Sequence, residues 1–217
     1  MVMQYTGAAT ADASEVIRSQ EGYAILRSHR WGTPPELVRA VARYLGLPER
    51  EQPFDLDACA EEGRSWGLRY YSADRSALWH QWGDSDGSVR HVWVNPPFGA
   101  RGVPRAALRR VGIDDSSFEP FPGIDAFIRQ AEAQSGAWGI EVACCLPTPT
   151  TAAGWRAIWG GSHWLHCGRV PFVGLDGVAQ RSPPGSHLIA IYDGQPYRGS
   201  PPVNVDFTEW RKRGEVR

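Results

Sequence analysis

The amino-acid sequence predicts an α/β protein with a twisted, mostly parallel β-sheet and an antiparallel edge. Apolar segments typical of strands alternate with segments whose apolar residues repeat at helical spacing, which favours parallel strands covered by helices on both faces. The segment GIEVACCLP (139–147) is a continuous apolar run, as expected of a strand buried on both faces. A chain of 217 residues with 42% hydrophobic and 22% charged residues can form one such domain with a sizeable core.

The first half of the chain contains one predicted helix and two clear strands, after an N-terminal arm or short helix over residues 1–30. In WGTPPELVRAVARYLGL (31–47), Thr33 is a suitable N-cap, Pro34 a suitable first helical residue, and the apolar stripe ends at Gly46. PFDLDACA (53–60) predicts a short strand with acidic residues at its carboxyl end. HVWVNP (91–96) predicts a strand that stops at Asn95, because proline excludes the preceding residue from helical backbone angles.

The second half continues the alternation. GIDAFIRQAEAQ (123–134) and TTAAGWRAIWGG (150–161) predict helices, and GIEVACCLP lies between them. HWLHCGRVPFVG (163–174) and HLIAIYDG (187–194) predict neighbouring strands that are at least partly antiparallel. Residues 99–122, with glycine, proline and four arginines, predict a long loop or insertion. We therefore expect an arm (1–30), one domain (31–195) and a proline- and glycine-rich tail (196–217).

Charge and cysteine content exclude some classes of protein. A net charge of −1 argues against binding nucleic acid through overall positive charge, although it leaves a local basic groove open. No apolar run approaches the roughly 20 residues of a membrane helix, and the N-terminus lacks the pattern of a secretory signal, so we expect a cytoplasmic protein. The four cysteines lack C-x-x-C spacing, which indicates reduced thiols and no metal site.

Polar residues follow several predicted strands at the point where each strand ends. Asp57, Asn95 and Pro147 occupy such ends, and ligands of parallel sheets bind beyond the carboxyl ends of the strands. Trp31 and Trp93 are candidates for lining the same pocket. The sequence therefore predicts an enzyme or a ligand-binding protein with its site at this edge.

The motif Asn-Pro-Pro-Phe (95–98) fits chemistry on a planar amine. The amide oxygen of Asn95 and the carbonyl of Pro96 can accept hydrogen bonds from an exocyclic amino group, Pro97 stiffens the turn, and Phe98 can stack on the ring. Two acceptors would help to localise the lone pair of that amine and direct it at an electrophile. A base within a duplex would have to be flipped out to reach such a pocket. The alternative is that the motif is only a stiff loop.

The sequence resembles the phage-type Dam-like DNA N6-adenine methyltransferases. The resemblance covers roughly residues 31–192 and rests on seven segments in the family's order: WGTPPEL, FDLDACA, YYSADRSALWHQW, VWVNPPFG, CCLPTPTTAAGW, CGRVPF and PPGSHLIAIY. It implies a compact S-adenosylmethionine-dependent methyltransferase fold, which is Rossmann-like. It also implies methyl transfer from S-adenosylmethionine to adenine N6 in double-stranded DNA of a bacterial or phage-infected cell. Asn95, Pro96, Pro97 and Phe98 would be the catalytic motif.

The resemblance also implies a cofactor site. Thr33 and Pro34 would lie near the methionine end of the cofactor, and Asp74 would approach its adenine ring. The end of the first strand would supply the remaining contacts: Asp55, Asp57, Ala58 and Cys59. The three aspartates could instead be turn or cap residues.

Two departures from the family's pattern affect this cofactor site. LDACAEEG offers only Gly63 where many methyltransferases have a glycine-rich loop, and about 37 residues between Asp57 and Asn95 are too few for two βα units. The usual acidic ribose-binding residue therefore has no obvious candidate, unless Asp55 or Asp57 substitutes for it.

The insertion is the predicted DNA contact, through Arg101, Arg105, Arg109 and Arg110, although these arginines could also be a solvated face. Other functions stay open at this point. The acceptor could be cytosine N4, adenine in RNA or a modified adenine, and the chain could be a non-catalytic DNA-binding relative.

Overall fold

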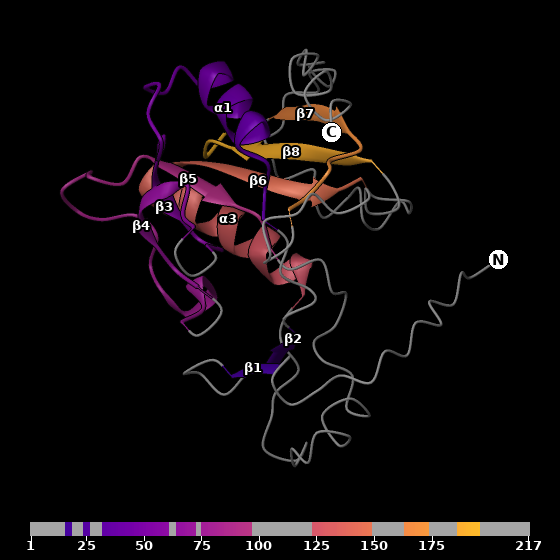
Figure 1. Cartoon of the computed structure of the whole chain (residues 1–217). Coiled ribbons are helices and arrows are strands. Elements are labelled where there is room, and N and C mark those ends of the chain that lie inside the picture. The colour runs from indigo at the N-terminus through magenta and orange to yellow at the C-terminus, as the bar shows by residue number, and fades with distance from the viewer. Residues whose placement is uncertain are drawn as a thin grey trace.

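Six strands form a mixed sheet in the order β4-β3-β5-β6-β8-β7 (Figure 1). The computed structural model describes residues 16–18, 24–26, 32–60, 64–72, 75–96, 123–148, 163–173 and 186–195. The strands of the sheet are β3 (Phe54–Asp57), β4 (Gly67–Tyr70), β5 (His91–Val94), β6 (Glu141–Pro147), β7 (His163–Gly168) and β8 (His187–Tyr192).

The pairing confirms the predicted mostly parallel sheet with antiparallel strands at one end. Strands β4, β3, β5 and β6 are parallel to one another, whereas β8 lies between β6 and β7 and is antiparallel to both. The carboxyl ends of β3, β5 and β6 therefore share one edge of the sheet, as the strand pattern predicted.

Two helices cover opposite faces of this sheet (Figure 1). Helix α1 (Pro35–Tyr44) places Leu37, Val38 and Val41 in a core with Phe54 and Trp93. Helix α3 (Ile124–Trp138) contributes apolar side chains to the core on the other face, where they meet alternate residues of the same strands. Both helices, and β6 with its buried run, agree with the sequence prediction.

Helix α1 begins one residue later than the sequence predicted. Pro34 is the N-cap, with backbone angles of −59° and 136°, and Pro35 is the first helical residue. The cause is the double proline, because Pro35 excludes Pro34 from helical angles. Thr33 is consequently not the cap and makes no capping hydrogen bond. The predicted end is correct, since Gly46 follows the helix with a φ of 71°.

Strand β4 was not predicted. Its sequence, Gly-Leu-Arg-Tyr, lies at the sheet edge with only the glycine buried, so it lacks a strand-like alternation. Nine residues, 58–66, connect β3 to β4, whereas parallel strands usually need a dozen or more. Gly67 permits this tight approach, because a Cβ atom there would overlap the backbone of Leu56 and Asp57.

Outside the sheet, Val16–Arg18 (β1) and Ala24–Leu26 (β2) pair antiparallel. The described part of the N-terminal segment is therefore strand and not the short helix considered above. The predicted helix at 150–161, the insertion at 99–122 and the tail at 196–217 lie outside the described residues. None of the four cysteines forms a disulfide. Within the described ranges, no helix has the length and apolar character to cross a bilayer.

Candidate active site

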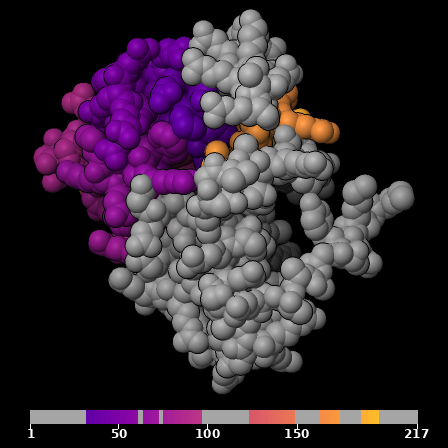
Figure 2. Space-filling model, viewed as in Figure 1, coloured from indigo at the N-terminus to yellow at the C-terminus, as the bar shows by residue number. Residues whose placement is uncertain are grey.

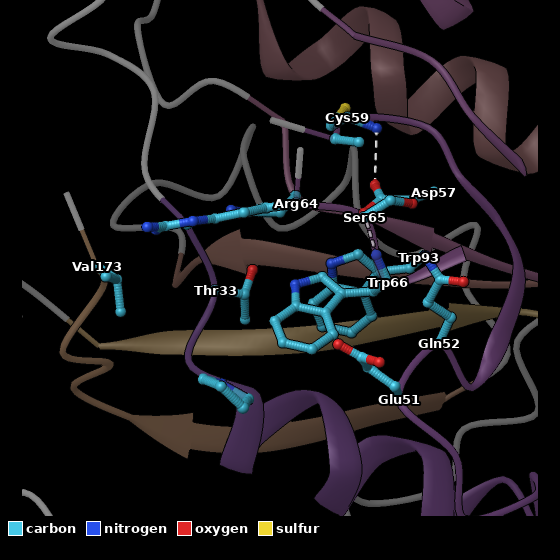
Figure 3. A pocket seen from close by; sticks show the side chains of 14 residues that line it. Thr33, Glu51, Gln52, Asp57, Cys59, Arg64, Ser65, Trp66, Trp93 and Val173 are labelled. Atoms are coloured by element: carbon cyan, nitrogen blue, oxygen red, sulfur yellow. Dashed lines mark hydrogen bonds between the residues drawn. The ribbon is translucent and has the colours of Figure 1, made fainter. Parts of the chain in front are cut away.

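A cavity of about 440 Å³ opens where β3 and β5 end and α1 begins (Figure 3). This volume lies within the usual range for small-molecule sites. The cavity brings together five residues that the sequence predicted for the site: Thr33, Asp57, Cys59, Trp93 and Asn95. The other lining residues are Gly32, Pro35, Glu51, Gln52, Ala60, Arg64, Ser65, Trp66 and Val173.

The segment before α1 is held against the sheet by the far end of the domain. Gly32 and Val173 exchange two backbone hydrogen bonds, each of 2.8 Å. Figure 2 shows the corresponding surface, where the indigo and purple residues of the first half border the orange residues of 163–173. This bridge positions Thr33, which is 4% exposed, at the cavity wall. Pro34 is buried beside it but does not line the cavity.

Asp57 organises the loop after β3. Its Oδ1 accepts a hydrogen bond from the backbone N–H of Cys59 (3.0 Å), and its Oδ2 accepts one from the backbone N–H of Trp66 (2.9 Å). The residue is 2% exposed. The backbone N–H of Ala58 donates to the carbonyl of Trp93 (2.9 Å), which ties the start of the loop to β5. These bonds anchor the described residues at the two ends of the connection from β3 to β4.

Asp55 does not line the cavity. Its Oδ2 accepts hydrogen bonds from the backbone N–H groups of Arg90 (2.9 Å) and His91 (3.0 Å) at the start of β5. Arg50 lies 3.6 Å from its other oxygen. The two aspartates that the sequence grouped therefore have different places. Asp57 lines the cavity, whereas Asp55 is hydrogen-bonded to the backbone at the start of β5.

Asn95 follows β5 directly, and its half-buried side chain lines the cavity. Pro96 is buried behind it. Pro97 and Phe98 lie outside the described residues, as do Asp74 and the arginines Arg101, Arg105, Arg109 and Arg110. Pro147 ends β6 at the same edge of the sheet but is not part of the cavity lining.

Several lining residues were not predicted. Glu51 and Gln52 precede β3, and Arg64 and Trp66 lie in the crossover to β4. Their positions depend on the short β3–β4 connection, for which the sequence carried no recognised signal. Trp93, a candidate from the sequence, does line the cavity, and Trp31 lies outside the described residues.

Two buried polar atoms on the cavity wall have no hydrogen-bond partner within the described part of the chain. They are the hydroxyl oxygen of Thr33 and the indole nitrogen of Trp93. Most buried polar atoms in proteins are hydrogen-bonded, so this pair suits a polar ligand. Among the residues that the structure describes, no group of three His, Cys, Asp or Glu side chains is placed to hold a metal ion.

Comparisons with known proteins relate this chain to one family. The profile of the family described as DNA N-6-adenine-methyltransferase (Dam) matches residues 26–197. A protein of Escherichia phage T1, named DNA N-6-adenine-methyltransferase, is 34% identical over 68 residues, which is 31% of this chain and 24% of the phage protein. The match thus spans about a quarter of that relative's length. No solved structure gives a significant match. Because the profile covers most of the sequence, including every residue of the cavity, the chain belongs to the DNA N-6-adenine-methyltransferase (Dam) family.

Proposed function

We propose that this protein transfers a methyl group from S-adenosylmethionine to the N6 amino group of adenine in DNA. The observation that carries the proposal is the shared cavity, in which Asn95 of the Asn-Pro-Pro-Phe motif meets the loop after β3 and the segment before α1. Family membership supports the same reaction. The mixed sheet is compatible with the Rossmann-like methyltransferase fold that the sequence resemblance implies.

The residues of the cavity fit the proposed cofactor. S-adenosylmethionine supplies an electrophilic methyl group, which leaves a neutral thioether when the methyl–sulfur bond breaks and the new nitrogen–carbon bond forms. Thr33 and Trp93 offer polar atoms that lack partners within the described ranges. The loop that Asp57 holds brings Cys59 and Ala60 to the wall. Asp57 acts in this proposal by positioning the loop, because both of its oxygens already accept backbone hydrogen bonds.

Asn95 is the proposed catalytic residue. Its amide oxygen, with the carbonyl of Pro96, would accept hydrogen bonds from the adenine amino group and orient its lone pair toward the methyl carbon. The two acceptors would stabilise the positive charge that develops on the nitrogen as the nitrogen–carbon bond forms, and the methylated amine then loses one proton to water. Adenine in a duplex would have to leave the base stack to reach this position.

The arginines of the insertion are the proposed DNA contact. Arg105, Arg109 and Arg110 lie within six residues of one another and follow the catalytic motif in sequence. Neutralising a phosphate releases counterions, so affinity for DNA should depend steeply on salt. Replacing all three by glutamine should weaken DNA binding. The slope of log binding constant against log salt concentration should become shallower by up to about 0.9 for each phosphate that is no longer neutralised. An unchanged slope would reject this assignment.

A labelling experiment tests the reaction. Purified protein, methyl-labelled S-adenosylmethionine and duplex DNA should yield labelled N6-methyladenine on nucleoside analysis. Asn95→Ala should lower the rate by at least about a hundredfold, the scale expected when one hydrogen bond to the transition state is removed, while cofactor affinity changes little. Glu132→Gln, at an exposed position of α3 on the other face of the sheet, is the control and should retain activity. Labelled N4-methylcytosine in place of N6-methyladenine would show that cytosine is the methyl acceptor and overturn the assignment to adenine. A protein that neither binds the cofactor nor labels DNA would overturn the proposal as a whole.

A further inference from the structure

Another cavity lies next to the candidate active site, on the exposed side of α1. Its volume is about 550 Å³, and it lies between the helix and the segment that leads from α1 to β3. The lining residues are Arg39, Ala42, Arg43, Leu47, Pro48, Glu49, Arg50, Glu51 and Pro53. We call this cavity the arginine groove, because three of its nine lining residues are arginines. No step of the proposed reaction uses it.

The backbone gives the arginine groove a defined shape. Helix α1 packs its apolar residues against one face of the sheet (Figure 1), so Arg39 and Arg43, four positions apart, lie next to each other on the exposed side. After the helix, the backbone N–H of Leu47 donates to the carbonyl of Ala42 (2.8 Å), which folds the chain back along α1. The segment 48–53 begins and ends with proline, which restricts its conformation. The arginines are therefore held on a stiff frame.

The arginines of this groove are only partly neutralised. Arg39 has no ion-pair partner within the described ranges. Arg43 lies 3.6 Å from Glu49, but both side chains are more than half exposed, which makes such a pair weak. Arg50 lies 3.6 Å from Asp55, which is not part of the lining. Like charges four positions apart on a helix repel each other, and a bound anion would relieve that repulsion.

A phosphate group suits this groove, and its position favours DNA as the source of the phosphate. The planar fork of a guanidinium group matches the oxygens of a phosphate. Glu51 lines both the arginine groove and the catalytic cavity, so the two share a wall, and Figure 3 shows Glu51 on the cavity side. A strand that delivers its base to Asn95 carries phosphates on both sides of that nucleotide. Because the net charge of the chain is −1, affinity for DNA has to come from local groups of cations.

We propose that Arg39 and Arg43, with Arg50 beside them, bind backbone phosphates of the DNA strand that carries the target adenine. This inference rests on the proposed function. It assigns a DNA contact to α1, in addition to the contact proposed for the insertion. The first residue of the same helix, Pro35, lines the catalytic cavity. One rigid helix thus joins the phosphate contact to the site of methyl transfer.

Fluorescence anisotropy with a labelled DNA duplex tests the groove. The double variant Arg39→Gln/Arg43→Gln loses two positive charges, and glutamine has nearly the helix propensity of arginine. At about 0.1 M salt it should bind the duplex at least about tenfold more weakly than wild type. The slope of log binding constant against log salt concentration should become shallower by up to about 1.8, the value for two phosphates.

The matched control is Arg129→Gln/Arg169→Gln, which removes the same charge elsewhere. Arg129 lies on α3, on the other face of the sheet, and Arg169 directly follows β7 at the far end of the strand order. Both are exposed, and neither lines the groove. This control should bind DNA almost as the wild type does. A loss equal to that of the groove variant would show a general effect of net charge and overturn the inference.

Steady-state methylation adds a measurement that separates DNA binding from damage to the fold. The groove variant should raise the KM for DNA at least about tenfold, while kcat and the affinity for S-adenosylhomocysteine stay at their wild-type values. The reason is that neither Arg39 nor Arg43 lines the catalytic cavity. A fall in kcat with an unchanged KM for DNA would overturn the phosphate contact.

The outcomes separate the groove from the function. Wild-type affinity and slope in the groove variant would overturn the arginine groove and leave the methyltransferase proposal standing. A wild-type protein that binds no DNA would overturn the proposed function itself. If the groove variant fails to fold, modification of the wild type by phenylglyoxal, an arginine reagent, decides the matter. Duplex DNA should protect Arg39 and Arg43 but not Arg129, as measured by peptide mass spectrometry, and equal modification with and without DNA would reject the inference.

Discussion

The carboxylate of Asp57 accepts a hydrogen bond from the backbone N–H of Trp66, nine residues further along the chain. The same carboxylate also accepts from the backbone N–H of Cys59, so one buried side chain holds the start and the end of the crossover between β3 and β4. This arrangement anchors both ends of the β3–β4 connection beside the cavity without a glycine-rich sequence. Asp57 therefore acts on the site by holding the backbone of two lining residues, Cys59 and Trp66, in place.

Replacing Asp57 should therefore damage both folding and cofactor binding. In Asp57→Ala, two backbone N–H groups lose an ionised partner, and we expect a loss of about 2–4 kcal/mol in the free energy of unfolding. Asp57→Asn keeps one acceptor oxygen and should fall between alanine and wild type. Urea unfolding measures the stability, and calorimetry with S-adenosylhomocysteine measures the binding. A stable Asp57→Ala protein with wild-type affinity would contradict the role assigned to this residue.

Asp55 should behave differently although it lies only two positions away. Its carboxylate bonds to the backbone of Arg90 and His91 and does not line the cavity. Asp55→Ala should lower the free energy of unfolding by about 1–3 kcal/mol while the folded protein keeps its affinity for S-adenosylhomocysteine. Calorimetry well below the unfolding temperature tests this. A tenfold loss of affinity in a folded Asp55→Ala protein would place this aspartate in the cofactor site after all.

The close approach of β4 to β3 predicts a severe effect at one glycine. In Gly67→Ala the new methyl group would overlap the backbone of Leu56 and Asp57, and no flexible side chain can yield there. We expect a loss of at least about 2 kcal/mol in the free energy of unfolding. Gly136→Ala is the matched control, because it lies within α3 with open space around its Cβ position. This control should gain about 1 kcal/mol from helix propensity. Similar stability of the two variants would contradict the described β3–β4 contact.

The strands and helices with a clear apolar period could be predicted from the sequence. The α3 helix has such a period, β5 and β6 were recognised as continuous apolar runs, and the parallel pairing of these strands followed from the alternation of strands and helices. Strand β4 could not be predicted in this way, because an edge strand with three exposed residues shows no burial period. The start of α1 was misplaced by one residue, because a residue before proline avoids helical angles, so that Pro35 and not Pro34 takes the first helical position.

The residues of the candidate site also divide into those that could be predicted from the sequence and those that could not. Asn95 and Asp57 could be predicted because each ends an apolar strand, and strand ends of a parallel sheet share one edge. Glu51 and Arg64 could not, because their places in the cavity depend on the paths of two irregular segments. Asp55 was grouped with Asp57 by proximity in sequence, whereas its carboxylate bonds to the neighbouring strand. Sequence spacing does not show which backbone N–H groups a side chain will reach.

His187 should make the stability of the protein depend on pH. It is buried at the start of β8, and burial lowers the pKa of its imidazole from 6.5 to about 4. The unfolded chain therefore binds more protons between pH 6.5 and 4, so the free energy of unfolding falls as the pH falls through this range. This histidine contributes about 2–3 kcal/mol of that loss, since one pKa unit corresponds to about 1.4 kcal/mol. Burial also lowers the pKa of His163, which acts in the same direction.

The measurement is urea unfolding at several pH values from 7 to 4.5. His187→Gln should show a shallower fall in the free energy of unfolding than wild type, whatever its stability at pH 7. His166→Gln, at an exposed position of β7, is the control and should keep the wild-type slope. An unchanged slope in His187→Gln would show that the imidazole is not buried as described.

Cys59 should be the thiol that reports on occupancy of the cavity. Burial raises the pKa of the Cys144 and Cys145 thiols well above their ordinary value and that of Cys167 to about 12, so these three form little thiolate near neutral pH. Cys59 is only partly buried and lines the cavity. A thiol-specific disulfide reagent at pH 8 should modify one thiol rapidly in the native protein, and Cys59→Ser should abolish that phase. Saturating S-adenosylhomocysteine should slow the reaction at least about tenfold, because a reagent reaches Cys59 only while the cavity is empty. Rapid labelling that is indifferent to this ligand would separate Cys59 from the binding site, and rapid labelling of several thiols would contradict the burial of the other three.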